Sequence, residues 1–111
     1  MVKATKEIEK FSIDILRYYK ELRSFIDGIN DNNIFSISND DIEGTKRLVN
    51  KLEQALSKLN PDQKELIKLR YIDHLDWELI SESISCSKRT AHNRNKEAVS
   101  IIVQTLFNEI N

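Results

Sequence analysis

Four cationic side chains stand close together in the last third of the sequence, and no acidic residue separates them. They are Lys88, Arg89, Arg94 and Lys96, although the 111-residue chain carries a formal net charge of −1. In an α-helix, which turns by about 100° per residue, one arc of about 140° would hold five polar side chains. These are Lys88, Arg89, His92, Asn93 and Lys96. Donors of this kind suit phosphate oxygens and guanine edges, and an asparagine can pair with adenine. The pattern predicts that this helix binds double-stranded DNA, with a merely solvated basic face as the alternative.

Reactive and metal-binding groups are scarce elsewhere in the sequence. Cys86 is the only cysteine and the chain has two histidines, so it contains no disulfide pair and no set of four cysteine and histidine zinc ligands. It shows no glycine-rich phosphate loop, no paired catalytic carboxylates and no Ser/His/Asp spacing. We therefore predict that the protein is not an enzyme and holds no cofactor or metal. We expect Cys86 to be a small packing residue and His74 to lie in a plain surface turn.

A short helix, a tight turn and a second helix would position the basic residues. Asp76 can cap a helix that runs from Trp77 to about residue 84, and Ser87 can cap a final helix from Lys88 to about Glu109. On the first helix, Ile80 and Ile84 share one face. Ala91 and Ala98, seven residues apart, are small enough for close packing on the second. This spacing predicts a helix-turn-helix, with Trp77 in the core rather than stacked on a base.

The rest of the chain also reads as helical, with only two glycines and one proline to interrupt it. We predict helices over about 4–29 and 41–59, separated by a loop over 28–40. Asp40 and Glu43 form an expected capping box for the second of these helices. A third helix should open at Asn60, with Pro61 in its first position. The predicted fold is all-α, with five helices. Residues 1–59 are expected to form a long helical hairpin, and residues 60–111 a helix-turn-helix domain.

An apolar seam with heptad spacing runs along the predicted first helix. Its members are Ile8, Phe11, Ile15, Tyr18, Leu22, Phe25 and Ile29. Such a seam favours lengthwise packing against another helix, either within the chain or in a homodimer. The apolar stretch VSIIVQTLF in the last helix is a second possible dimer contact.

The segment from Leu59 to Leu106 resembles region 4 of sigma-70-type factors. The residues that carry the resemblance are LNPDQKELIKLRYIDHLDWELISESISCSKRTAHNRNKEAV. The chain also resembles small phage transcription activators of the ArpU and RinA type, which its short length, the absence of sigma region 2 and its many Ile, Asn and Lys residues fit better than a full sigma factor. The resemblance implies that the second helix of the motif enters the major groove. By that implication Lys88, Arg89, His92 and Asn93 face bases, and Ser87, Arg94 and Lys96 contact phosphates.

Four positions depart from the usual family pattern. Leu79 stands where glutamate is common, Ser81 where alanine is common, Ser85 where glycine is common and Ala91 where valine or isoleucine is common. Of these, Ser85 matters most, because it puts a side chain into the turn. It would need a positive φ or a slightly different turn.

The sequence thus favours a sequence-specific, DNA-binding transcription regulator that is encoded by a phage or prophage and acts as a dimer or with help from RNA polymerase. One alternative is a module that binds RNA polymerase or a sigma factor with little DNA affinity of its own. Another is a DNA-packaging subunit similar to phage small terminases. The N-terminus MVKATKEIEK lacks an apolar signal core, and no apolar run approaches the ~18 residues of a membrane span. We expect a cytoplasmic protein without membrane contact.

Overall fold

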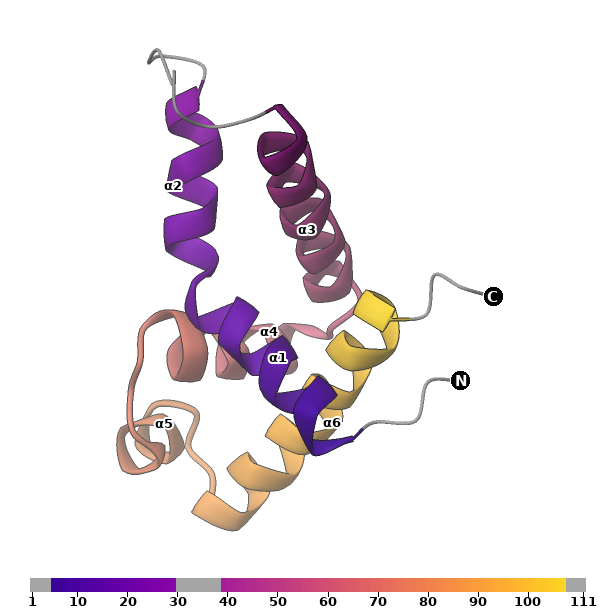
Figure 1. The fold of residues 1–111 in the computed structure, drawn as a ribbon. Helices are drawn as coiled ribbons and strands as arrows, with labels where there is room; N and C mark the ends of the chain where they lie inside the picture. Colours follow the sequence, from indigo (N-terminus) through magenta and orange to yellow (C-terminus); the bar gives the residue numbers. More distant parts are fainter. Residues whose placement is uncertain (1–4, 30–38, 108–111) are drawn as a thin grey trace.

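The computed structural model describes residues 5–29 and 39–107, and every regular element in these two ranges is a helix (Figure 1). The elements are α1 (Lys6–Arg17), α2 (Tyr19–Ile29), α3 (Asn39–Ser57), α4 (Pro61–Ile67), the π-helix η1 (Lys68–Ile72), α5 (Trp77–Ser83) and α6 (Lys88–Phe107). The prediction of an all-α fold is confirmed. Most of the predicted loop 28–40 and the predicted end of the last helix at Glu109 lie outside the described residues.

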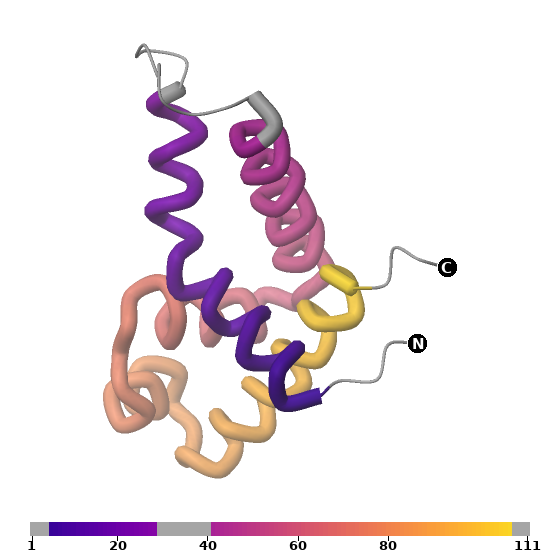
Figure 2. The backbone as a smooth tube through the Cα atoms, in the orientation of Figure 1, coloured from indigo at the N-terminus to yellow at the C-terminus, as the bar shows by residue number. Residues whose placement is uncertain are grey.

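The predicted first helix is not continuous, because it breaks at Tyr18. This residue has φ −98° and ψ 8°, and its amide is shared between the carbonyl oxygens of Asp14 and Ile15, each 3.2 Å away. After the break the chain changes direction (Figure 2), so that α1 packs on α6 while α2 packs along α3. The prediction of one helix over 4–29 is therefore wrong, and the lengthwise hairpin is formed by α2 and α3.

The break divides the heptad seam between two sets of neighbours. Ile15 is buried in the core and Leu22 packs against it, but the Phe11 side chain is 50% exposed and Tyr18 is 62% exposed. On α2, the Tyr19 hydroxyl donates a 2.8 Å hydrogen bond to Glu53 of α3. A straight helix would satisfy either the packing of Ile15 in the core or the hydrogen bond from Tyr19 to Glu53. The bend at Tyr18 allows both contacts.

One buried apolar cluster joins the N-terminal and C-terminal parts of the described chain. It comprises Ile15, Leu16, Leu52, Ala55, Leu59, Ile67, Tyr71, Ala98, Val99, Ile102, Val103 and Leu106. These side chains come from α1, α3, the segment from Leu59 to Tyr71, and the second half of α6. The division into domains at residues 59 and 60 stays a prediction, and both predicted parts contribute to this cluster.

Two of the predicted helix starts can be compared directly. Asn60 forms a complete capping box, in which its Oδ1 accepts from the Gln63 amide at 2.8 Å and its own amide donates to Gln63 Oε1 at 3.0 Å. By contrast α3 begins at Asn39. The expected capping box of Asp40 and Glu43 is therefore wrong, because Asp40 already lies inside the helix.

The helix that opens at Asn60 ends in a π-helical stretch that the sequence did not predict. The Asp73 amide donates to the Lys68 carbonyl at 2.8 Å, and the Leu75 amide donates to the Leu69 carbonyl at 3.0 Å. His74 then takes a positive φ of 59°, which ends the helical stretch. The wider π turn includes Tyr71, which is only 3% exposed and lies next to the middle of α6.

Candidate nucleic-acid interface

The turn between α5 and α6 is held by a set of local hydrogen bonds. Asp76 caps α5, since its Oδ1 accepts from the Leu79 amide at 2.9 Å. At the other end of α5, the Cys86 amide donates to the Ser81 carbonyl at 3.0 Å and the Ser85 amide donates to the Glu82 carbonyl at 3.3 Å. This pairing is typical of a helix C-cap whose turning residue is left-handed.

Ser85 is that left-handed residue, with φ 55°. Of the two outcomes expected for a serine at this position, a positive φ or a slightly different turn, the structure shows the positive φ. A left-handed conformation costs a residue with a Cβ about 1 to 2 kcal/mol relative to the right-handed one. The turn therefore stores a small strain that the hydrogen bonds on either side offset.

Ser87 caps α6 as predicted. Its Oγ accepts from the Thr90 amide at 3.1 Å, and its hydroxyl donates to Thr90 Oγ1 at 3.0 Å. Behind the turn, Ile80 and Ala91 are fully buried. Alanine at this position allows α5 and α6 to approach closely, which confirms the predicted helix-turn-helix packing.

The first half of α6 projects beyond the core, whereas the second half belongs to it. Between Lys88 and Glu97 only Ala91 is buried, while five of the six buried residues of the helix lie from Ala98 onward. The predicted site residues are therefore accessible. Ser87, Lys88, Arg89, His92, Asn93 and Lys96 are exposed, and Arg94 is half-buried. The structure brings these side chains together on one projecting half-helix.

The neighbouring helix α5 contributes negative charge to this surface, which the spacing within the basic stretch alone does not predict. The Lys88 ammonium lies 3.6 Å from a carboxylate oxygen of Glu78, and the two side chains are 57% and 72% exposed. Glu82, one turn further along α5, is also exposed. The half-helix is thus cationic, but one of its cations already has an acidic partner in the free protein. Within the described ranges no ion pair is found for Arg94.

A stack of aromatic and cationic side chains connects the helices of the motif. The Arg70 guanidinium carbon lies 4.7 Å from the centroid of the Trp77 ring, and the Trp77 and His92 ring centroids are 4.1 Å apart at 38°. Arg70 also donates a 3.1 Å hydrogen bond to the Leu75 carbonyl. Trp77 is half-buried between these partners. His92 is therefore both an exposed residue of the projecting half-helix and a bracing contact to α5.

A buried hydrogen bond fixes α6 just behind its exposed half. Asn95 Nδ2 donates to the Tyr71 hydroxyl at 2.9 Å, while Asn95 Oδ1 is buried and has no partner among the described residues. Burial raises the pKa of the Tyr71 hydroxyl, and the hydrogen bond from Asn95 opposes this rise. The neutral phenol thus anchors η1 on α6 and orients the half-helix relative to the core.

Other kinds of site were sought in the same part of the chain. Residues 5–29 and 39–107 contain no group of three or more His, Cys, Asp or Glu side chains arranged to hold a metal ion. None of the helices in these ranges has the length and apolar character needed to span a bilayer.

The comparison with protein families agrees with this geometry. Residues 50–99 match the family model of sigma-70, region 4. The matched range runs from the second half of α3 through the projecting half of α6. This match confirms the predicted resemblance to sigma-70 region 4. That region is a DNA-binding helix-turn-helix domain. No curated protein and no solved structure matches the chain.

Proposed function

We propose that this chain, in which residues 50–99 form a sigma-70 region 4-like domain, is a sequence-specific transcription regulator that places the first half of α6 in the major groove of DNA. The observation that carries the proposal is the projecting half-helix itself. It bears four cations and no carboxylate from Lys88 to Lys96, outside the core, directly after a capped helix-turn-helix.

The side chains divide by their positions on the half-helix. Lys88, Arg89, His92 and Asn93 are the candidates for contacts with base edges, where arginine and lysine prefer guanine and asparagine prefers adenine. Ser87, Arg94 and Lys96 are the candidates for phosphate contacts. The chain resembles phage activators of the ArpU and RinA type, so we propose a phage or prophage regulator.

Electrostatics limit what one such helix can achieve. The four cations of the half-helix together would give a slope of at most roughly −3 to −4 for log affinity against log salt concentration, reached only if each neutralised one phosphate. One bidentate pair between an arginine and guanine adds about 1 to 3 kcal/mol of discrimination. This is little for a single module, so we propose that RNA polymerase or a second copy of the chain assists binding.

The test is a selection of random DNA duplexes on the purified chain at two salt concentrations. We expect an enriched sequence motif that Arg89→Ala abolishes. Arg17→Ala is the matched control, because Arg17 is equally exposed but lies on α1. Absence of binding even at low salt would refute the placement of α6 in the major groove.

A second candidate function is supported by the acidic side chains on α5. Glu78 and Glu82 are exposed on the helix that would brace the DNA backbone, where they would repel phosphates. The domain could therefore serve mainly as a module that binds RNA polymerase. If promoter activity in a transcription assay persists when Lys88 and Arg89 are both alanine, this second function is favoured over the first.

A further inference from the structure

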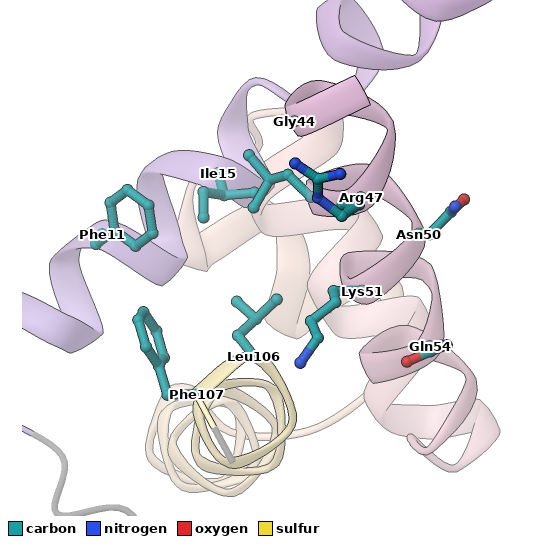
Figure 3. Close-up of a pocket in the computed structure, with 10 residues that line it drawn as sticks. Phe11, Ile15, Gly44, Arg47, Asn50, Lys51, Gln54, Leu106 and Phe107 are labelled. Atoms are coloured by element: carbon teal, nitrogen blue, oxygen red, sulfur yellow. The ribbon is translucent and has the colours of Figure 1, made fainter. Parts of the chain in front are cut away.

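An open groove lies at the end of α6 that is remote from the basic half-helix. It has a volume of about 490 Å³ and is bordered by α1, α3 and the last turn of α6 (Figure 3). Its apolar lining includes Phe11, Ile15, Leu48, Leu106 and Phe107. The Phe11 ring is 50% exposed, although it meets the Phe107 ring at a centroid distance of 5.9 Å. The groove therefore leaves large apolar side chains in contact with solvent.

Cations line one side of the groove. Among the described residues that border it, the charged ones are Arg47 and Lys51, four residues apart on α3, and no carboxylate is among them. Figure 3 shows both side chains extending from α3 on the side that faces α1 and α6. An apolar surface edged by the exposed Arg47 is complementary to an apolar ligand that carries a carboxylate, which arginine binds through two hydrogen bonds.

The surrounding elements restrict the form of that ligand. The groove is framed by three helices, and the described part of the chain offers no strand edge to which an extended peptide could add. A helix laid into an apolar groove, with anchors at positions i, i+3 or i+4 and i+7, is a common mode of peptide recognition and suits a groove lined by apolar side chains between helices.

We propose that this groove is a docking site for an acidic, amphipathic helix of a partner protein. The proposal goes beyond DNA binding and does not depend on it. At about 1.5 Å per residue, the 20 residues of α6 place Phe107 about 28 Å from Lys88. A partner in the groove therefore leaves the basic half-helix uncovered.

Gly44 supplies a variant that blocks the groove without disturbing the core. It borders the groove on α3, and a Cβ built on it meets no atom within 4 Å. In Gly44→Trp, an indole would occupy the space of the ligand. Arg47→Glu reverses one of the two charges at an exposed position. Lys58→Glu is its matched control, because Lys58 is exposed just beyond the end of α3 and does not border the groove.

The experiment is a selection, against the full chain, of a displayed library of random peptides of about 16 residues. This length allows two helical turns on either side of the centre of the peptide. We expect enriched peptides that combine apolar residues at helical spacing with Asp or Glu. Their affinity should fall at least about tenfold for Arg47→Glu and for Gly44→Trp, and stay unchanged for Lys58→Glu. Circular dichroism and thermal melting confirm that each variant is folded.

Three outcomes would overturn the proposal. The first is that no peptide is enriched, or that the enriched peptides lack acidic residues. The second is that binding persists in Gly44→Trp. The third is that the wild-type chain forms a dimer in sedimentation experiments and Gly44→Trp makes it a monomer, because a second copy would then be the occupant.

Discussion

Removing one carboxylate from α5 should tighten DNA binding. In the free protein the Lys88 ammonium is 3.6 Å from a Glu78 carboxylate oxygen, and we propose that Lys88 faces the duplex. Glu78→Gln preserves the size of the side chain but removes the charge that attracts Lys88 and would repel phosphates. Glu82→Gln is the matched control, because Glu82 is exposed one turn later on α5 and no ion pair is found for it among the described residues.

The exposure of the ion pair limits the size of the effect. The two side chains are 57% and 72% exposed, so the pair is a surface pair. Such pairs contribute about 0.2 to 1 kcal/mol, and releasing Lys88 should therefore lower the Kd for DNA by a factor of about 1.5 to 5. If the released Lys88 neutralises a phosphate instead of contacting a base edge, the log–log salt slope should also steepen by up to about 0.9. The general effect of one lost negative charge is common to both glutamine variants.

Fluorescence anisotropy with a labelled duplex, at several salt concentrations, measures these changes. The gain in Glu78→Gln should exceed that in Glu82→Gln, and this excess should disappear when Lys88 is also changed to glutamine. An excess that survives in the Lys88→Gln background would refute the reasoning, because it could not come from releasing Lys88. An equal gain in the two glutamine variants would do the same.

Three further predictions concern stability and protonation. Ser85→Gly removes a serine in the left-handed conformation and should stabilise the protein by about 0.5 to 1 kcal/mol, which raises Tm by roughly 2 to 4 °C in thermal denaturation. Ser83→Gly, which lies inside α5, should instead lower Tm. Gly44→Ala should raise the free energy of unfolding by about 0.5 to 1 kcal/mol in urea titrations, since the added Cβ meets no atom within 4 Å and alanine favours the helix. The hydrogen bond from Lys68 lowers the pKa of the Asp73 carboxyl, so this pair should stabilise the fold above the ordinary pKa of aspartate and lose its effect as the pH falls through the lowered value. In Lys68→Gln the pKa of Asp73, followed by NMR, should return toward its ordinary value; an unchanged pKa would contradict this cause.

The helix-turn-helix could be predicted from the sequence because local chemistry defines its boundaries. Asp76 and Ser87 cap their helices through their own side chains. Ser85 stands where the chain turns left-handed, and its departure from the family's common glycine pointed to a positive φ or a slightly different turn. Each of these interactions spans only a few residues, so spacing and residue type contain the information that is needed.

The features that the sequence did not predict depend on contacts between distant residues. No proline or glycine marks the break at Tyr18, and the apolar spacing continues through it. The bend arises because α1 and α2 pack against different helices, and no local pattern records this. The pairing of Lys88 with Glu78 and the stacking of Trp77 on His92 likewise require the angle between α5 and α6. Charge along one helix therefore describes only part of the surface that a ligand meets.

The distribution of charge bears on how such a regulator would find its site. The chain has a sequence pI of about 6.1, and one of the four cations on the half-helix faces Glu78. Non-specific attraction to DNA, which grows with each neutralised phosphate, is then small for this chain alone. A second contact that tethers the chain near its site would raise the effective concentration of the half-helix without adding any base contact. The groove between α1, α3 and the end of α6 could provide that contact without altering the half-helix, because the intervening part of α6, from Ala98 to Val103, is packed in the core.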